Sequence, residues 1–388
     1  MIKSNKNNNI YDDDKRNMKK NNIKHEIIFT PTFGYKPQYM VGRDNIISDF
    51  MESLAGAPGH PHRATFFIGQ RGMGKTVLLL ELAELSKKMG FIAIRTVAGE
   101  RMLDEIIEGI QIAGERLPGE RKIPLKSVSA GAFGFSAGLT FTDDIQNNFG
   151  FRTKLSLLCD VLTKRKKGVL FLIDEIRASS SEVREFSTTY QHLIGDRMNV
   201  AVAMAGLPNA VSAVLNDEIL TFLNRAHKVN LNPLLIDDVS ACFYHALQSA
   251  NVEFDAKTLD AAAQATKGYP YLFQLIGYNI FKLLKDENRL TATIVELAAA
   301  NAKRALASDV FMPCLNPLSA EDKRFLSAMA KDSEESRTSD IRERLGAEKS
   351  HVQTYRRRLI EAGVIHSASR GLLAFSIPYL GQYLRGEI

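Results

Sequence analysis

The sequence has 388 residues, 45% hydrophobic and 24% charged, a composition typical of a soluble globular protein with roughly two or three domains. It contains no uncharged apolar run of about 18 residues, and its polar N-terminus lacks the apolar segment of a secretory signal, so we expect no membrane span and a cytoplasmic location. The formal net charge of +6 permits nucleic acid as a partner without requiring it.

The chain begins with a polar segment. Residues 1–28 are rich in Asn, Lys and Asp and offer little surface to bury, which predicts a disordered tail. Contact of its lysines with an anionic partner remains open, although the composition favours a plain solvated tail. A glycine turn at Met40-Val41-Gly42 follows and leads into a predicted helix over 44–54.

A short apolar strand over 65–68, a glycine-rich turn and a leucine-rich helix come next. The turn has the spacing G-x-x-x-x-G-K-[ST], in which glycines let successive backbone N–H groups point at phosphate oxygens beside a helix N-terminus. We expect Lys75 to reach the β and γ phosphates of ATP and the Thr76 hydroxyl to bind Mg²⁺. The predicted phosphate loop comprises Gly69, Gln70, Arg71, Gly72, Met73, Gly74, Lys75, Thr76 and Val77.

The glycine turn ahead of this loop is the candidate site for the adenine base. Met40 and Val41 are apolar and would pack on the base, while Gly42 would form the turn. The sequence therefore predicts contacts for both ends of the nucleotide.

After the phosphate loop, strands and helices alternate. We predict a buried strand over 91–97 and helices over 102–117 and 149–164. Between these helices, residues 127–142 alternate small or polar with apolar side chains, which predicts a hairpin inserted on the core. Since this hairpin has no titratable side chain, a flap without chemistry is as good an interpretation as a functional one.

Residues 168–175 form an apolar run that ends in two acids. Downstream of a phosphate loop, this is the Walker B pattern of a buried parallel strand. Asp174, at the carboxyl end of the strand, is expected to hold Mg²⁺ through water. Glu175 is expected to orient or deprotonate the attacking water.

The next elements contain two further candidates for catalysis. A helix over 180–194 and a buried strand over 200–205 precede Asn209, which would either sense the γ phosphate or cap a helix. Arg225, ahead of a predicted strand over 228–231, would either act in a neighbouring subunit's site or form a surface salt bridge.

In this order, the Val-Gly-Arg box, GQRGMGKT, FLIDEI, AGLPN and the NRA segment resemble the AAA+ ATPases, and most of all their Orc1/Cdc6-type and archaeal-ATPase branches. The resemblance covers about residues 30–310. It implies an α/β fold, with a P-loop NTPase core and parallel sheet over 29–232 and a helical lid over 233–312. Lid helices are predicted at 235–250, 255–266, 271–284 and 293–307.

One segment departs from this family. AAA+ proteins usually carry a sensor arginine at the start of a lid helix, whereas this chain has Gly268-Tyr269-Pro270-Tyr271. The Gly-x-Pro pattern is closer to the signalling NTPases called STAND proteins, in which the proline packs near the nucleotide. Pro270 is therefore a candidate nucleotide contact and Tyr271 takes the place of the arginine. We expect slow hydrolysis with nucleotide binding retained.

Residues 313–388 have the pattern of a winged helix-turn-helix domain. Its predicted elements are helices at 319–330, 338–345 and 348–362 and strands at 363–365 and 371–377. Val352, Tyr355 and Leu359 share one face of the third helix, so we expect the opposite face to be exposed. Candidate contacts to double-stranded DNA on that face and on the wing are Lys349, Ser350, Gln353, Thr354, Arg357 and Arg370.

The sequence thus predicts an ATP-binding switch, in which ATP and Mg²⁺ close the lid and reposition the winged helix. DNA is the favoured partner of the winged helix. The alternative is a signalling or regulatory NTPase with negligible hydrolysis, because winged helices also dock proteins. A ring-shaped motor would depend on Arg225 alone.

Overall fold

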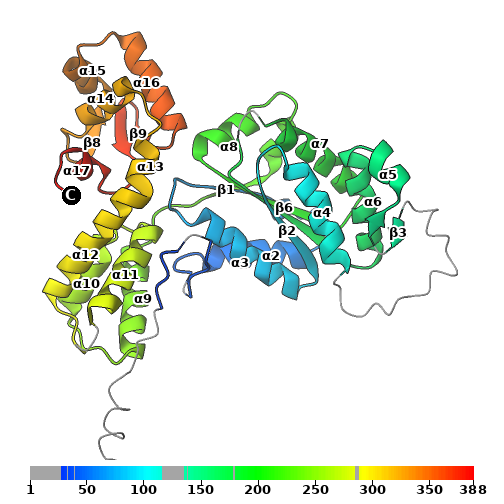
Figure 1. The fold of residues 1–388 in the computed structure, drawn as a ribbon, viewed down its shortest axis with the longest axis horizontal. Helices are drawn as coiled ribbons and strands as arrows, with labels where there is room; N and C mark the ends of the chain where they lie inside the picture. Colours follow the sequence, from blue (N-terminus) through cyan, green and yellow to red (C-terminus); the bar gives the residue numbers. More distant parts are fainter. Residues whose placement is uncertain are drawn as a thin grey trace, which may run out of the picture.

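The computed structural model describes residues 28–32, 34–38, 40–115, 135–137, 139–177, 180–284 and 288–388. The predicted tail, apart from Ile28, and residues 127–134 and 138 of the predicted hairpin lie outside these residues. The described part of the chain forms a lid and a winged-helix domain in one column, with an α/β core beside it (Figure 1). Among these residues, no helix is long and apolar enough to span a lipid bilayer.

The core is built on a parallel five-stranded sheet with the order β2-β5-β6-β1-β7. Its strands are β1 (Ala64–Ile68), β2 (Phe91–Val97), β5 (Gly168–Asp174), β6 (Val200–Gly206) and β7 (His227–Asn230). The strands β5 and β6 are buried along their whole length, as expected for central parallel strands covered on both faces. Because all strands run the same way, their carboxyl ends meet at one edge.

Helices cover both faces of this sheet because the strand side chains alternate between two hydrophobic cores. Phe67 points into one core and Phe66 into the other. The first face is covered by α2 (Asp44–Ala55) and α3 (Lys75–Lys88). The second is covered by α4 (Met102–Glu115), α6 (Phe151–Lys164), α7 (Ser181–Gly195) and α8 (Pro208–Leu215).

Short elements complete the core. They are η1 (Pro61–Arg63), β3 (Phe135–Ala137), β4 (Thr140–Phe141), α5 (Asp143–Asn148) and η3 (Thr221–Arg225). The strands β3 and β4 pair antiparallel, so the part of the predicted hairpin that the structure describes is a hairpin.

The lid consists of α9 (Ile236–Ser249), α10 (Ala256–Ala265), α11 (Pro270–Leu284) and α12 (Ala292–Leu306). The segment before α2 also packs on the lid, because the ring of Phe29 is fully buried between Phe243, Phe273 and Phe281. Residue 29, expected to begin the core, thus contributes to the hydrophobic interior of the lid.

The winged-helix domain follows without a break in helical backbone. A π-helical turn, η4 (Ala307–Phe311), and α13 (Met312–Leu315) continue α12, so the boundary predicted at 312–313 lies inside this helical run. The domain contains α14 (Ala320–Met329), β8 (Glu335–Arg337), α15 (Thr338–Leu345), α16 (Lys349–Glu361), β9 (Ile365–Ser369), β10 (Leu372–Phe375) and α17 (Leu380–Leu384).

The wing differs from its prediction in two ways. Residues 366–369, which lie between the two predicted strands, belong to strand β9, because the chain reverses later, at Arg370-Gly371, where Gly371 has φ +83°. The sheet also has a third strand, β8, paired with β10. This strand is too short for its residues to show a period in the sequence.

Candidate functional site

A cleft of about 1280 Å³ lies where the core, the lid and the winged-helix domain meet. Its floor is the phosphate loop between β1 and α3, and one side is formed by the carboxyl ends of β5 and β6. The opposite side is formed by the start of α11, by the helical run through η4 and α13, and by α16. Three parts of the chain that are distant in sequence therefore share this cleft.

The phosphate loop has the backbone that its glycines make possible. Gly72 and Gly74 have φ angles of +75° and +81°, and Gly74 caps the N-terminus of α3. Lys75 Nζ donates hydrogen bonds to the carbonyl oxygens of Gly69 and Gln70, at 2.8 and 2.9 Å. Burial, together with the nearby Arg71 guanidinium, lowers the pKa of Lys75 to about 8. The lysine is thus held beside the loop, where its charge can act on phosphate.

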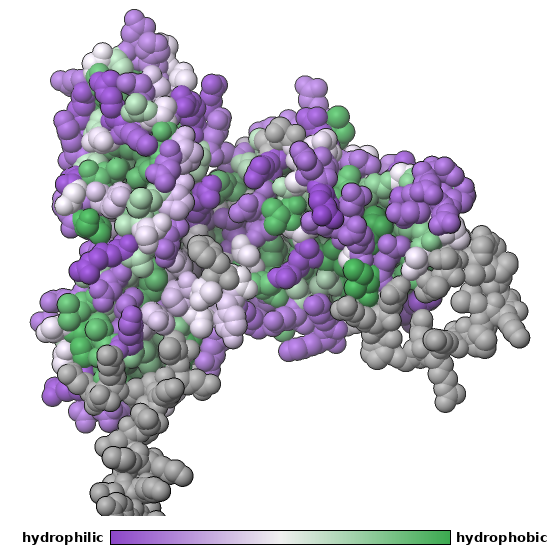
Figure 2. Space-filling view, in the orientation of Figure 1, coloured by the Kyte–Doolittle hydropathy of each residue, from purple (hydrophilic) through white to green (hydrophobic). Residues whose placement is uncertain are grey.

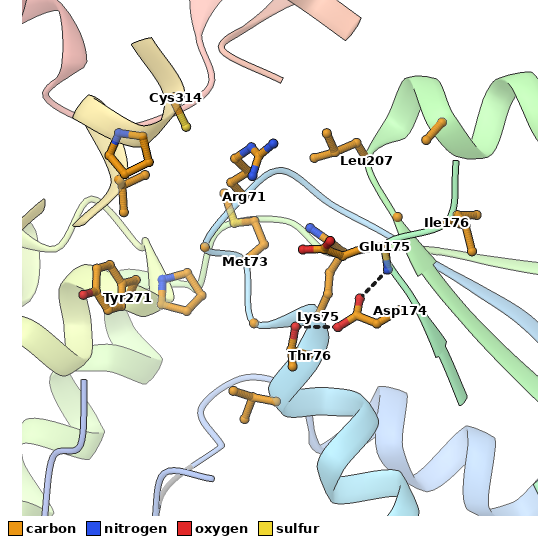
Figure 3. Close-up of a pocket in the computed structure, with 18 of the residues that line it drawn as sticks. Arg71, Met73, Lys75, Thr76, Asp174, Glu175, Ile176, Leu207, Tyr271 and Cys314 are labelled. Carbon is orange, nitrogen blue, oxygen red and sulfur yellow. Dashed lines mark hydrogen bonds between the residues drawn. The ribbon is translucent and has the colours of Figure 1, made fainter. Parts of the chain in front are cut away.

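The two predicted metal ligands, Thr76 and Asp174, are hydrogen-bonded to each other. Thr76 Oγ1 donates to Asp174 Oδ2 at 2.6 Å, and the Glu175 backbone N–H donates to Asp174 Oδ1 at 2.9 Å. Figure 3 shows Lys75, Thr76, Asp174 and Glu175 on the same side of the loop. A hydroxyl and a carboxylate are oxygen donors of the kind that Mg²⁺ binds, so these residues fit the metal.

Glu175 has an unusual backbone conformation. Its φ angle is +51°, in the left-handed region that residues other than glycine seldom adopt. Such conformations persist where the surroundings impose them, and they concentrate at functional sites. Here the backbone turns immediately after the buried Asp174, and the Glu175 side chain is exposed in the cleft.

The structure places the other predicted core residues as follows. Val41 and Asn209 line the cleft. Gly42 lies outside the lining, in a turn with φ +64° beside Leu234. Arg225 is exposed at the end of η3 and does not reach the cleft of its own chain. Along the loop, Arg71 to Val77 line the cleft, whereas Gly69 and Gln70 lie just behind it.

On the lid, the residues of the Gly-x-Pro pattern face the phosphate loop. Pro270 and Tyr271 line the cleft, and the Tyr271 hydroxyl donates to Asp309 Oδ2 at 2.8 Å. Burial and this carboxylate raise the pKa of Tyr271. In Figure 3, Tyr271 lies across the loop from the acidic pair. It is therefore joined to the helical run that leads to the winged-helix domain.

Sequence reasoning missed the role of Tyr269. This side chain is fully buried, and its hydroxyl donates to the Arg71 carbonyl oxygen at 2.8 Å. A Cβ atom on Gly72 would lie 2.0 Å from the same hydroxyl, so glycine is required there for close packing as well as for its φ angle. An aromatic residue before a proline gave no signal of this contact.

Half of the candidate DNA contacts lie in the cleft. Gln353, Thr354 and Arg357 line it, together with their neighbour Arg356, which the sequence did not single out. Lys349, Ser350 and Arg370 are exposed and lie outside the lining. As predicted, Val352 and Leu359 are buried on the inner face of α16. The helix faces were therefore predictable, but what the outer face meets was not.

Comparisons with known proteins concern mainly the fold. Residues 308–384 match the model of a domain of unknown function (DUF8462). No curated protein matches the sequence significantly. Many solved structures resemble this chain, and two that cover nearly all of it illustrate the similarity. The Aeropyrum pernix ORC2 protein, in ADPNP-ADP complexes, has a TM-score of 0.60 at 13% identity and covers 92% of this chain and 96% of its own. The Walker-type ATPase PABY2304 of Pyrococcus abyssi has a TM-score of 0.63 at 15% identity and covers 94% and 100%.

Proposed function

Because this chain has the fold of P-loop AAA+ ATPases, we propose that it is an ATP-binding ATPase that acts as a nucleotide-dependent switch. The observation that carries the proposal is the convergence of Lys75, Thr76, Asp174 and Glu175 on one side of the phosphate loop. A phosphate-binding lysine, two oxygen ligands for Mg²⁺ and an exposed carboxylate are the groups that phosphoryl transfer to water requires.

Each residue has a distinct role in this proposal. Lys75 and the loop N–H groups bind the phosphates, and Thr76 and Asp174 hold Mg²⁺, which neutralises phosphate charge when bound. Glu175 accepts a proton as the water oxygen bonds to the γ phosphorus and the bond to the bridging oxygen of ADP breaks. Asn209, at the end of the neighbouring strand, orients the water or the γ phosphate.

The nucleotide base lies at the other end of the cleft in this proposal. Met40 and Val41 line that part of the core, and Pro270 faces it from the lid. Arg43 also lines the cleft, but its buried guanidinium donates to the Asn232 carbonyl oxygen at 2.8 Å, so it is held in the structure rather than free to bind phosphate.

Slow hydrolysis is part of the proposal. Among the described residues that the lid contributes to the cleft, none is cationic, and the Tyr271 hydroxyl is directed at Asp309. A transition state that receives little charge stabilisation from the lid is reached slowly. We expect turnover well below the roughly 10 per second that is typical of enzymes. Arg225 is exposed and available to complete a neighbouring subunit's site.

The proposal also includes a partner, double-stranded DNA, and a location, the cytoplasm. Lys349, Ser350 and Arg370 are exposed cationic or polar groups on α16 and the wing, as phosphate contacts require. A specific observation favours the second candidate, a regulatory NTPase whose winged helix docks protein. Gln353, Thr354 and Arg357 face the cleft, so in this conformation α16 does not present its whole outer face to a duplex.

Duplex binding measured by fluorescence anisotropy at several salt concentrations separates these candidates. If DNA is the partner, replacing Arg357 and Arg370 with Glu abolishes the contacts, and each arginine lost lowers the salt slope by about one. Circular dichroism checks that the double mutant is folded. Binding by the mutant equal to that of the wild type, or no binding by the wild type at low salt with ATP, would leave the protein-docking candidate.

A further inference from the structure

The winged-helix domain touches the core at the phosphate end of the cleft. Helix α16 packs against α8, the helix that starts beside Asn209. At the end of α16, a Cβ atom on Gly363 would lie 3.1 Å from Leu207 Cδ1 and 3.7 Å from Gln70 Oε1. Gln70 belongs to the phosphate loop, and Leu207 follows the β6 strand end. In Figure 2, the two parts are separated by a notch at the top and meet below it.

Helix α16 is held in this position from three sides. Arg358, the last of three consecutive arginines, donates to the buried Asp322 at 2.7 Å and so fixes α16 to α14. The Tyr379 hydroxyl donates to the Ala265 carbonyl oxygen at 2.8 Å, and Lys303 lies over its ring, which fixes the domain to the lid. Through Tyr269, the lid is bonded to the phosphate loop. These three contacts join α16, its domain, the lid and the phosphate loop, and together they set the orientation of α16 toward the cleft.

The side chains of Arg356 and Arg357 differ in how they are held. Arg356 Nη2 reaches Ser367 Oγ of the wing at 3.5 Å. Arg357 Nε lies 3.9 Å from Glu361 Oε1, beyond hydrogen-bond distance, and its side chain is 72% exposed. Arg357 thus lines the cleft with a guanidinium that is free to bind an anion. Its helix contacts the core at the same end as the phosphate loop.

We propose that Arg357 binds the terminal phosphate of a nucleoside triphosphate in this cleft, so that the winged-helix domain itself distinguishes ATP from ADP. This inference rests on the proposed ATP-binding function. The lid brings no cation to the cleft among the residues described, and Arg357 supplies one from α16.

The test compares a triphosphate with a diphosphate. Affinities for ADPNP and ADP are measured by isothermal titration calorimetry with Mg²⁺, for the wild type, Arg357→Ala and Arg357→Lys. We expect Arg357→Ala to weaken ADPNP binding about tenfold or more, the effect of a lost charged hydrogen bond, and to change ADP binding by less than about threefold. Arg357→Lys, which keeps the charge, restores part of the ADPNP affinity.

Two control variants make the outcomes distinct. Arg342→Ala, at an exposed position on α15 outside the cleft, should leave both affinities unchanged. Lys75→Ala should weaken both nucleotides. An unchanged ratio of ADPNP to ADP affinity in folded Arg357→Ala would overturn the assignment while leaving ATP binding in place. Failure of the wild type to bind either nucleotide would overturn the proposed function and, with it, this inference.

Discussion

The two sides of the cleft are built differently. The core wall consists of the phosphate loop, Asp174, Glu175 and Asn209. The lid wall consists of Pro270, Tyr271 and the cleft face of α16, with Tyr269 buried behind it. In the core wall, the functional groups stand at the end of a parallel strand or in the turn or first helical turn that follows it, and the sheet brings the strand ends together. In the lid wall, the groups meet only because whole domains dock. Local sequence motifs therefore place the groups of one wall, and contacts between domains place those of the other.

The surface of the molecule and the interior of its lid and winged-helix domain also differ in where their hydrophobic residues lie. On the face shown in Figure 2, hydrophobic residues of the described chain are scattered in small groups among hydrophilic ones. The apolar contacts of the lid and winged-helix domain are instead internal, since residues of both domains share one hydrophobic core with α3. The lid wall is thus held by burial and by a few directed hydrogen bonds. These differences can be tested one residue at a time.

The largest effect is expected in the core wall. Glu175→Gln keeps the shape of the side chain and removes the base, so ATP hydrolysis should fall by about 10²- to 10⁴-fold. Binding of Mg²⁺-ATP should persist, because Thr76 and Asp174 remain. Phosphate release and nucleotide affinity are measured in parallel, with the exposed Glu185→Gln of α7 as the control. Unchanged turnover would show that Glu175 does not activate the water.

Behind the lid wall, where α14 holds α16 through Asp322 and Arg358, the largest effect should be on stability. Asp322 is 1% exposed and accepts hydrogen bonds from Ser319 and Arg358. Asp322→Ala removes the Asp322 half of the capping box at the start of α14 and a buried ion-pair partner, which should cost about 3 kcal/mol in free energy of unfolding. Chemical denaturation measures this loss. The neighbouring Glu321→Ala removes only an exposed pair with Arg324 and should cost less than about 1 kcal/mol. Equal losses would mean that Asp322 does not anchor α16.

Lys75→Ala should weaken ATP binding by about 10- to 100-fold, the loss of a charged hydrogen bond to phosphate. The fold should be unchanged, since the ammonium group bonds only to loop carbonyl oxygens. Titration calorimetry and thermal unfolding without nucleotide check both statements. Lys88→Ala, exposed at the far end of the same helix, is the control. If the Lys75→Ala variant bound ATP as tightly as the wild type, the assignment of this loop as the phosphate-binding loop would be wrong.

The smallest effect is expected from the hydrogen bond that joins the two walls. Tyr269→Phe keeps the buried ring but removes the hydrogen bond to the Arg71 carbonyl oxygen. The free energy of unfolding should fall by about 1 kcal/mol. Hydrogen exchange at the phosphate loop and at the start of α11 should speed up together. Tyr244→Phe, at a residue of α9 that is 42% exposed, should change neither. Faster exchange in only one of the two segments would argue against coupling through this bond.

The sequence by itself determined the core wall. The spacing of Gly69, Gly74, Lys75 and Thr76 fixes a loop backbone within a few residues, and an apolar strand that ends in Asp174-Glu175 must finish at the same sheet edge. Here local backbone geometry carries the chemistry, so a motif is sufficient to predict it. The parallel sheet and the burial of Val352 and Leu359 were predictable for the same reason.

Only the tertiary structure decided the lid wall. Helical periodicity showed which face of α16 packs in its own domain, but it holds no information on what the opposite face meets. The position of Arg357 depends on Arg358 bonding to Asp322, Tyr379 to Ala265 and Tyr269 to Arg71, contacts between residues 36, 114 and 198 positions apart. Such contacts follow from the shapes and directions of packed side chains, which no short stretch of sequence specifies.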